Sequence, residues 1–355
     1  MSLSFTLYTP EPPAAFGLDL SDDSLKIAQL SKARKMTVVD ILHKESLPAG
    51  AIVDGEIKNA DAVASVLKRV YDENRRILVP SVVLSLPETQ TFTATIRVAK
   101  KDNKTLSELL TDALAEYLPD SIDKLYYNTQ TIGEDNESWD VLVGAAPQAL
   151  VLPYLDVVEK AGLTTLVLDI EALATANALI SNKSDAEKTR AIINLGSRRA
   201  SLILYTKGSV RFTLSLPISG EAVTKELQEQ LAITREQAEQ TKRLCGLDGK
   251  KCDGVLRQVL ERMVQNLLDR IDEGRKYYRD HHPGSSEIEE IILSGGGAHL
   301  IGLDTILTEA LSIPVRLGNI WENTSIVRPP EVESPLSFAT VIGLAERALI
   351  EEKNL

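Results

Sequence analysis

Cysteine, histidine and aromatic residues are scarce in this chain. Its 355 residues include 2 cysteines, Cys245 and Cys252, and 4 histidines. Zinc sites require Cys or His pairs at ligand spacing, and because none is present we do not expect a zinc protein. We expect the two cysteines to be unpaired thiols in a reducing cytoplasm. The aromatic content of 5% also argues against a surface on which nucleic-acid bases stack.

Long apolar runs and an excess of basic charge are also missing. The formal net charge is −12, so we expect no nucleic-acid partner. No stretch reaches the roughly 18 consecutive apolar residues that span a bilayer. The closest, residues 163–180, contains Asp169 and Glu171, and residues 349–353 lack the basic face of an amphipathic membrane anchor. We therefore expect a cytoplasmic protein without direct membrane insertion.

A pattern of three short strands joined by tight turns occurs twice. The strands are expected at Phe16–Leu20, Leu25–Leu30 and 36–42, and again at Ala191–Leu195, Ser201–Tyr205 and Val210–Leu216. Asp19 in the first passage corresponds to Asn194 in the second, which is 194 − 19 = 175 residues later. The repeat predicts two lobes that are built on one plan and face each other across a cleft.

The length of the chain and this repeat set the expected domain organisation. Residues 1–15, which carry three prolines, are expected to be a flexible extension. The first lobe is expected at 16–180 and the second at 181–337. Residues 338–355 are expected to form a C-terminal helix that packs back on the first lobe.

A small α+β unit is expected to be inserted in the first lobe at about residues 77–145. Two strands precede a helix, and two more strands follow it around an acidic loop. Thr105, with Glu108 three residues later, forms a capping box that predicts where this helix begins.

A strand that runs into three consecutive glycines is the strongest functional signal. Residues 291–293 are apolar, Gly295, Gly296 and Gly297 follow Ser294, and a helix is expected from Gly302 to Leu311. Glycine lets a ligand approach the backbone closely, and strand-to-helix turns of this kind bind nucleotides in α/β folds. Hairpin turns near Asp19 and Asn194 could cradle phosphates, and a carboxylate beside them could hold a hydrated metal ion.

These motifs together resemble the actin-like ATPase superfamily and, within it, the PilM family of type IV pilus assembly, with FtsA as a second relative. The resemblance covers about residues 16–350 and implies an α/β, two-lobed actin-like ATPase (ribonuclease H-like) fold with an inserted small α+β subdomain. Residues 16–26 resemble the phosphate-1 motif, residues 193–200 the phosphate-2 motif, and residues 294–298 the adenosine motif.

The resemblance also implies a role for individual residues. Asp19, Ser21, Asp22 and Lys26 would belong to phosphate-1, Asn194, Gly196 and Ser197 to phosphate-2, Glu239 and Lys242 to the ribose and adenine site, and Gly295, Gly296 and Gly297 to the adenosine turn. Asp19 would hold Mg²⁺ through water, and Glu171 would orient the attacking water. The implied cofactor is ATP or ADP with Mg²⁺, or none if the phosphate site is degenerate.

The phosphate motifs depart from the family pattern. Ser21 and Asp22 stand where the family has glycine followed by Ser or Thr, so that Asp22 and Asp23 would repel a polyphosphate. Asn194 stands where the family has aspartate, which weakens metal binding. Because hydrolysis needs an accurately placed metal and water, we expect weak nucleotide binding and little turnover. Arg198 and Arg199 either bind phosphate directly or belong to a solvated turn.

Several of these residues also have simpler explanations. Asp19 could cap its hairpin turn, Lys26 could face solvent, and Glu171 could be an acid at a helix start. Glu239 and Lys242 could form a surface ion pair at i,i+3.

The resemblance implies an adaptor of the type IV pilus assembly platform, attached peripherally to the inner membrane through partners. Its implied partners are the cytoplasmic N-terminal peptide of a PilN-like membrane protein and other platform proteins. The peptide would enter a cleft between the main lobe and the small subdomain. The alternatives are an ATP-hydrolysing conformational switch and an FtsA-like polymerising, membrane-tethered protein.

Overall fold

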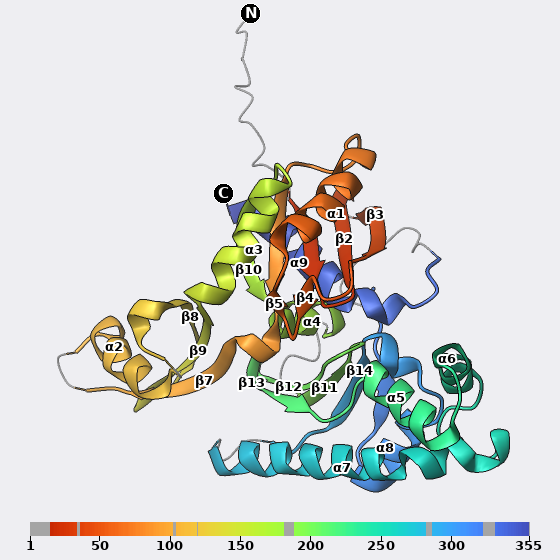
Figure 1. Cartoon of the computed structure of the whole chain (residues 1–355). Coiled ribbons are helices and arrows are strands. Elements are labelled where there is room, and N and C mark those ends of the chain that lie inside the picture. The colour runs from red at the N-terminus through yellow and green to blue at the C-terminus, as the bar shows by residue number, and fades with distance from the viewer. Residues whose placement is uncertain are drawn as a thin grey trace, which may run out of the picture.

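The computed structural model describes residues 15–33, 36–101, 104–118, 120–180, 188–281, 286–321 and 331–354. Apart from Ala15, which is buried, the expected N-terminal extension lies outside these residues. Two lobes, each built on a sheet, lie one above the other in Figure 1, and a smaller unit projects from their side. None of the helices described is long and apolar enough to cross a membrane.

The first lobe is a five-stranded sheet with helices α1 (Ala60–Glu73) and α3 (Gln148–Lys160) packed into its core. The strand order is β10 (Thr164–Ile170), β6 (Ser81–Leu86), β1 (Phe16–Leu20), β2 (Ser24–Ala33) and β3 (Met36–Ser46). Strands β1, β2 and β3 form the expected antiparallel meander, and β6 and β10 run parallel to β1. The short strands β4 (Ile52–Val53) and β5 (Glu56–Ile57) form a separate hairpin beneath the β1–β2 turn.

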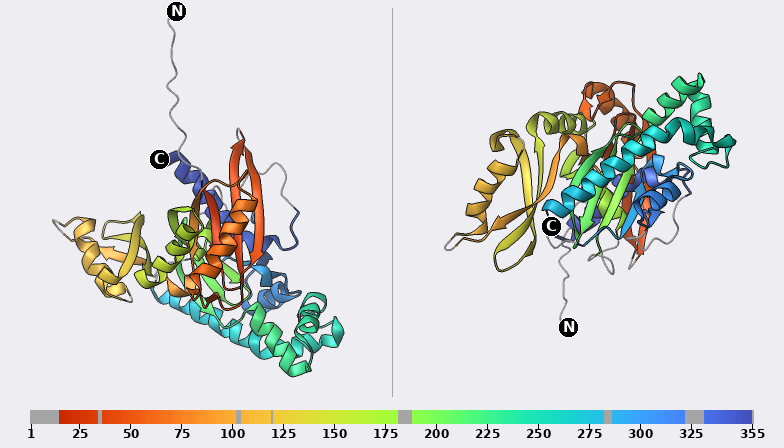
Figure 2. Two further views of the ribbon diagram at one scale, coloured as in Figure 1. Left: turned by 45° about the horizontal axis from the view of Figure 1, so that its top comes forward. Right: turned by 90° about the horizontal axis from the view of Figure 1, so that it is seen from below.

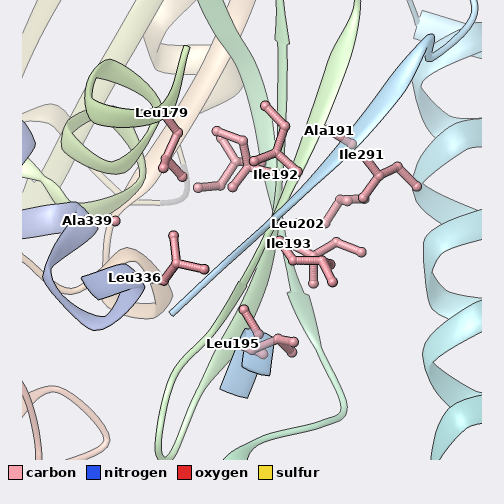
Figure 3. Packing of buried hydrophobic residues seen from close by; sticks show 14 of the residues in the cluster. Leu179, Ala191, Ile192, Ile193, Leu195, Leu202, Ile291, Leu336 and Ala339 are labelled. Carbon is pink, nitrogen blue, oxygen red and sulfur yellow. The ribbon is translucent and has the colours of Figure 1, made fainter. Parts of the chain in front are cut away.

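The second lobe repeats this arrangement. Its strands are, in sheet order, β15 (Val315–Leu317), β14 (Glu290–Ser294), β11 (Arg190–Leu195), β12 (Ala200–Thr206) and β13 (Ser209–Leu216). A meander is again extended by parallel strands, which confirms the predicted repeat. Figure 3 shows the core that these strands share with Leu179 and Leu336.

Four helices accompany the second sheet: α5 (Gly220–Leu231), α6 (Arg235–Leu244), α7 (Val255–His281) and α8 (Leu303–Leu311). The long helix α7 runs along the lower side of the molecule (Figure 2) and contacts the sheet at Gly274, next to Leu202 and Leu214. Thr234, with Gln237 three residues later, also fits the capping-box pattern in sequence, and the capping box is present at the start of α6.

Helices α4 (Glu171–Leu179) and α9 (Ala339–Asn354) cross in the centre of the molecule. A β-carbon at Gly343 would lie 1.8 Å from the carbonyl oxygen of Ala174, so this crossing depends on glycine. The Thr175 and Thr340 hydroxyl groups share a hydrogen bond of 2.9 Å across it. Helix α9 also packs on β1, β2 and β6 of the first lobe.

The projecting unit consists of β7 (Phe92–Ala99), α2 (Leu106–Tyr117), β8 (Leu125–Glu134) and β9 (Ser138–Pro147) around a small core of its own. Its sheet joins the second lobe, because Ala94 of β7 pairs with Phe212 of β13. The expected start of this unit at residue 77 is too early, since β6 lies between β1 and β10 in the first sheet. The capping box at Thr105 and Glu108 is present.

The expectation of two free thiols is wrong. Cys245 and Cys252 are joined by a disulfide that closes the turn between α6 and the 3-10 helix Cys252–Gly254. Their α-carbons are 5.6 Å apart, which lies in the usual range for a disulfide. Sequence alone gave no reason to pair them, because the two residues lie only seven positions apart in a chain that was expected to be cytoplasmic.

Candidate functional site in the interlobe cavity

A cavity of 490 Å³ lies between the two lobes, within the usual size range of a small-molecule site. Every candidate residue from the sequence lines it: Asp19, Ser21, Asp22, Lys26, Glu171, Asn194, Gly196, Ser197, Glu239, Lys242, Gly295, Gly296 and Gly297. The fold thus brings together motifs that are up to 278 residues apart (297 − 19).

Asp19 and Lys26 form a buried ion pair at the floor of the cavity. They lie opposite each other on β1 and β2, and Lys26 Nζ donates to Asp19 Oδ2 at 2.7 Å. The other oxygen, Oδ1, accepts a hydrogen bond from the Ser85 hydroxyl at 2.9 Å. Lys26 is therefore not a solvent-facing residue, and Asp19 does not cap the turn. Both side chains have satisfied partners before any ligand binds.

The two acids of the first hairpin turn point in different directions. Asp22 is 4% exposed, and its carboxylate accepts from the backbone N–H groups of Asp54 and Gly55, each at 3.0 Å. Arg199 lies 3.4 Å from the same carboxylate. The charge of Asp22 is thus directed into the first lobe, and not at a phosphate as its sequence position suggested. Ser21 is occupied within the turn, where its backbone N–H and hydroxyl both donate to the Ser24 carbonyl oxygen.

Asp23 crosses the cleft to the second hairpin turn. Its carboxylate accepts from Ser197 Oγ and from Arg198 Nε, both at 2.8 Å. Arg199 bridges to the segment before β7 through Thr89 Oγ1 at 3.1 Å. Each arginine pairs with an acid of the first lobe, but Arg198 is 42% exposed whereas Arg199 is only 20% exposed.

Part of the backbone of the second hairpin turn is already hydrogen-bonded. The Gly196 N–H donates to the Arg199 carbonyl at 2.9 Å, which closes the turn. The carbonyls of Gly196 and Ser197 accept from the first N–H groups of α5, at Gly220 and Glu221. The side chains of Ser197 and Arg198 add a hydroxyl and a guanidinium to the donors of this turn.

Two buried carboxyl groups lie close together: Glu171, which lines the cavity, and Glu88, which does not. Asn194 Nδ2 donates to Glu171 Oε1 at 3.3 Å, and burial, followed by the charge of Asp19, raises the pKa of Glu171. Burial raises the pKa of Glu88 to about 8, although hydrogen bonds with Ser201 and Thr213 oppose this. Glu88 is thus largely protonated at neutral pH. An aspartate in place of Asn194 would face these acids, which explains why an amide suits this position.

The three glycines of the adenosine turn serve different purposes. Gly295 has φ +81°, and a β-carbon on it would lie 2.4 Å from the Leu195 carbonyl oxygen. A β-carbon on Gly297 would lie 2.9 Å from that of Leu195. Gly295 thus needs glycine for its backbone conformation and its packing, and Gly297 for its packing. A β-carbon on Gly296 would meet no atom within 4 Å, so this backbone is the part left open to a ligand.

Glu239 and Lys242 belong to a network that joins α6 to α5. Lys242 Nζ donates to Glu239 Oε1 at 2.8 Å, to Thr224 Oγ1 at 2.5 Å and to the Gly220 carbonyl at 3.0 Å. The two side chains do pair with each other at i,i+3, but this is not an isolated surface ion pair, because Lys242 is only 15% exposed. Burial raises the pKa of Glu239, but the hydrogen bonds from Lys242 and Thr224 outweigh it and lower that pKa.

The cavity lining bears on two kinds of ligand, a metal ion and a nucleoside. Among the residues that the structure describes, no group of three or more His, Cys, Asp or Glu side chains is arranged to hold a metal. Both Asp19 oxygens already accept a hydrogen bond, from Lys26 and from Ser85, so hydrated Mg²⁺ at Asp19 would lie beside the Lys26 ammonium group. The open backbone at Gly296 and the apolar side chains of Leu300 and Leu303 offer a surface for a base and sugar.

Sequence reasoning missed two features of this site. Glu88 stands in a polar turn, where nothing in the sequence indicates burial against the second lobe. Asp23 was seen only as a repelling charge, and its bridge to Ser197 and Arg198 was not foreseen.

Comparison with known proteins agrees with this geometry. Residues 17–349 match the family described as type IV pilus assembly protein PilM. FtsA of Pseudomonas aeruginosa is 24% identical over 56% of this chain and 51% of its own length, and FtsA of Bacillus subtilis is 22% identical over 81% and 63%. The chain thus spans about half the length of the first of these curated relatives.

Solved structures show the same fold. A PilM–PilN type IV pilus biogenesis complex aligns with a TM-score of 0.80 at 22% identity, covering 96% of this chain and 99% of the other. MreB5 of Spiroplasma citri bound to ADP aligns with a TM-score of 0.56 at 14% identity over 97% and 99%. These likenesses establish a two-lobed actin-like fold. With 333 consecutive residues (349 − 17 + 1) matched to one family, the chain belongs to the PilM family of actin-like type IV pilus assembly proteins, which is related to FtsA.

Proposed function

We propose that this chain is a cytoplasmic adaptor of the type IV pilus assembly platform, held at the inner membrane by its partners. Its main partner would be the cytoplasmic N-terminal peptide of a PilN-like membrane protein. The observation that carries this proposal is the alignment of 96% of the chain, at a TM-score of 0.80, with a protein solved in a PilM–PilN complex.

The projecting unit offers an extended peptide a place to bind. Strand β8 is the last strand of its sheet, and most of its side chains are exposed. Tyr126 and Tyr127 are each 47% exposed on this strand. Because Leu125 pairs with Pro147, which directly precedes α3, this edge begins where the unit meets the first lobe. An added peptide strand would use the free backbone groups of β8, and the tyrosines would supply side-chain contacts.

The interlobe cavity would bind ATP or ADP weakly and would hydrolyse it little. The cations that would meet phosphates already have acidic partners: Lys26 pairs with Asp19, Arg198 with Asp23, and Arg199 with Asp22. A phosphate must displace these acids before it can form its own ion pairs with the same cations. This supports a binding protein over an ATP-hydrolysing switch.

Fluorescence anisotropy with a labelled synthetic peptide of the PilN-like N-terminus tests the partner proposal. We expect the native chain to bind and the Tyr126→Ala/Tyr127→Ala variant to bind at least about tenfold more weakly, as expected when interface aromatics are lost. Leu317→Ala is the matched control, since Leu317 is 44% exposed on β15 at the opposite end of the same sheet. Absence of binding by the native chain would refute the adaptor role, and equal binding by the tyrosine variant would refute the β8 edge alone.

A further inference from the structure

Asp23 lines the cavity and contacts the second hairpin turn, at Ser197 and Arg198. It comes from the first lobe, yet both of its carboxylate oxygens accept from the second lobe, Oδ2 from Ser197 Oγ and Oδ1 from Arg198 Nε, each at 2.8 Å. The two turns are 175 residues apart in the chain (198 − 23), and they also meet where Arg199 lies 3.4 Å from the Asp22 carboxylate. The bridge is 40% exposed at Asp23 and 42% at Arg198, so solvent and small anions can reach it.

The groups that hold Asp23 are those that would hold a phosphate. A hydroxyl and a guanidinium bind carboxylate and phosphate oxygens by the same charge-assisted hydrogen bonds. The N–H of Gly196 is not available to an anion, since it is used within the turn. An anion that enters the turn must therefore compete with Asp23 for Ser197 and Arg198.

The surrounding charges favour such an anion once Asp23 withdraws. Seven basic side chains line the cavity: Lys26, Lys44, Arg198, Arg199, Arg235, Lys242 and Arg243. The six acids that line it are Asp19, Asp22, Asp23, Glu171, Glu221 and Glu239. With all of them charged the balance is 7 − 6 = +1, and without Asp23 it is 7 − 5 = +2.

Lys44 adds to this field from β3. It lies directly opposite Lys26 on the neighbouring strand, and among the described residues it has no hydrogen-bonded or ion-paired partner. Burial and the charge of Lys26 lower the pKa of Lys44, although the charges of Asp23 and Glu333 oppose this. Its ammonium group is a ready neighbour for a phosphate that displaces Asp23.

We propose that Asp23 is a built-in phosphate mimic: its carboxylate fills an anion site formed by Ser197 and Arg198, and a phosphate-type anion binds there by displacing it. The proposal deepens the weak nucleotide binding proposed above and rests on it. Nucleotide binding is weak because the Asp23 carboxylate competes for the same donors. We call the contacts of Asp23 with Ser197 and Arg198 the clasp, and the clasp opens when phosphate enters.

Isothermal titration calorimetry on the full chain tests the clasp with inorganic pyrophosphate and, separately, with ADP. We expect Asp23→Ala to bind at least about tenfold more tightly than the native chain, since one repelling charge is lost and two donors are freed. A gain for both probes would mean that the site recognises phosphate as such, and a gain for ADP alone would mean that it recognises a nucleotide. Either result supports the clasp.

Two variants separate the clasp from simpler effects. Asp156→Ala removes the same charge from α3, outside the cavity, and should bind like the native chain. Asp23→Ala/Arg198→Ala also lacks the Asp23 carboxylate, but it has lost the guanidinium that the anion would bind, and it should lose the gain. Thermal unfolding of each variant checks that it is folded.

The clasp is refuted if folded Asp23→Ala binds no more tightly than the native chain, or if its gain survives removal of Arg198. These outcomes do not depend on the partner proposal, which is tested by the fluorescence anisotropy of the labelled peptide. Tight binding of Mg-ATP by the native chain would overturn the proposed weak affinity, whereas the ratio between Asp23→Ala and native affinities would still decide the clasp.

Discussion

At the scale of single residues, several basic side chains of the interlobe cavity are already paired with acids of the protein. Lys26, Arg198 and Arg199 each meet an acid across a turn or across the cleft. Such pairs cost a ligand more than an open cation would, because the ligand must replace an existing hydrogen bond rather than only water. These side chains therefore stabilise the fold without a ligand, and a nucleotide would have to break their ion pairs in order to bind.

Glu88 shows how this polar centre affects stability. An unfolded glutamate ionises near pH 4.5, whereas burial keeps Glu88 protonated up to a pKa of about 8. Between these values the folded state holds more protons than the unfolded state. The free energy of unfolding should therefore fall as the pH rises from about 4.5 to 8, by at most about 1.4 kcal/mol per pH unit. The raised pKa of Glu171 acts in the same direction.

Replacing Glu88 by glutamine removes this pH dependence while keeping the shape of a protonated acid. We expect Glu88→Gln to be more stable than the native chain at pH 8 and nearly equal to it at pH 5, measured by urea unfolding at both values. Glu116→Gln, at an exposed position of α2, is the control and should follow the native curve. A variant that is less stable than the native chain at pH 8 would show that Glu88 is ionised and stabilising there.

At the scale of elements, the features that the sequence predicted are local ones. Capping boxes at Thr105 and Thr234, the glycine turn and the strand repeat depend on neighbours within a few residues, and each is present. The clasp could not be predicted in this way. Asp22 and Asp23 are adjacent in sequence, yet one turns into its own lobe and the other crosses the cleft, and only the position of the second lobe decides which.

The predicted start of the projecting unit is wrong for a related reason. A buried strand such as β6 has the same apolar composition whether it belongs to the main sheet or to an insertion. Its partners are β1 and β10, and pairing with β10 joins residues about 80 positions apart. Sequence spacing alone therefore placed β6 with the elements that follow it.

The crossing of α4 and α9 provides a prediction at this scale. Gly343→Ala would place a methyl group 1.8 Å from a backbone oxygen of α4, and backbone cannot move aside as a flexible side chain can. We expect a loss of about 3 kcal/mol or more in the free energy of unfolding. Gly133→Ala is the matched change, because its new methyl group would meet Asp140 at an ordinary 3.6 Å. Denaturant unfolding of both variants measures the difference, and similar midpoints would mean that the two helices can separate at little cost.

At the scale of the whole molecule, the lobes and the projecting unit are built differently. The two lobes have the same strand order and share the crossing helices α4 and α9. The projecting unit has a separate core, formed by residues such as Ile96, Val141 and Val143. One strand pairing, between Ala94 and Phe212, joins its sheet to the second lobe. We infer that this unit can open or shift without unfolding the lobes, which suits an element that receives a partner.

Native-state hydrogen exchange tests this independence with two matched changes. Ile96 and Ile192 are buried isoleucines of the projecting unit and of the second lobe, and replacing either by alanine should cost about 2–5 kcal/mol locally. Because local opening follows cooperative units, Ile96→Ala should speed exchange within residues 92–147 and leave β11 and β14 protected. Ile192→Ala should speed exchange throughout the lobes. If Ile96→Ala instead exposed β11 as strongly as β9, the molecule would unfold as one unit, and a partner bound to the projecting unit would act directly on the interlobe cavity.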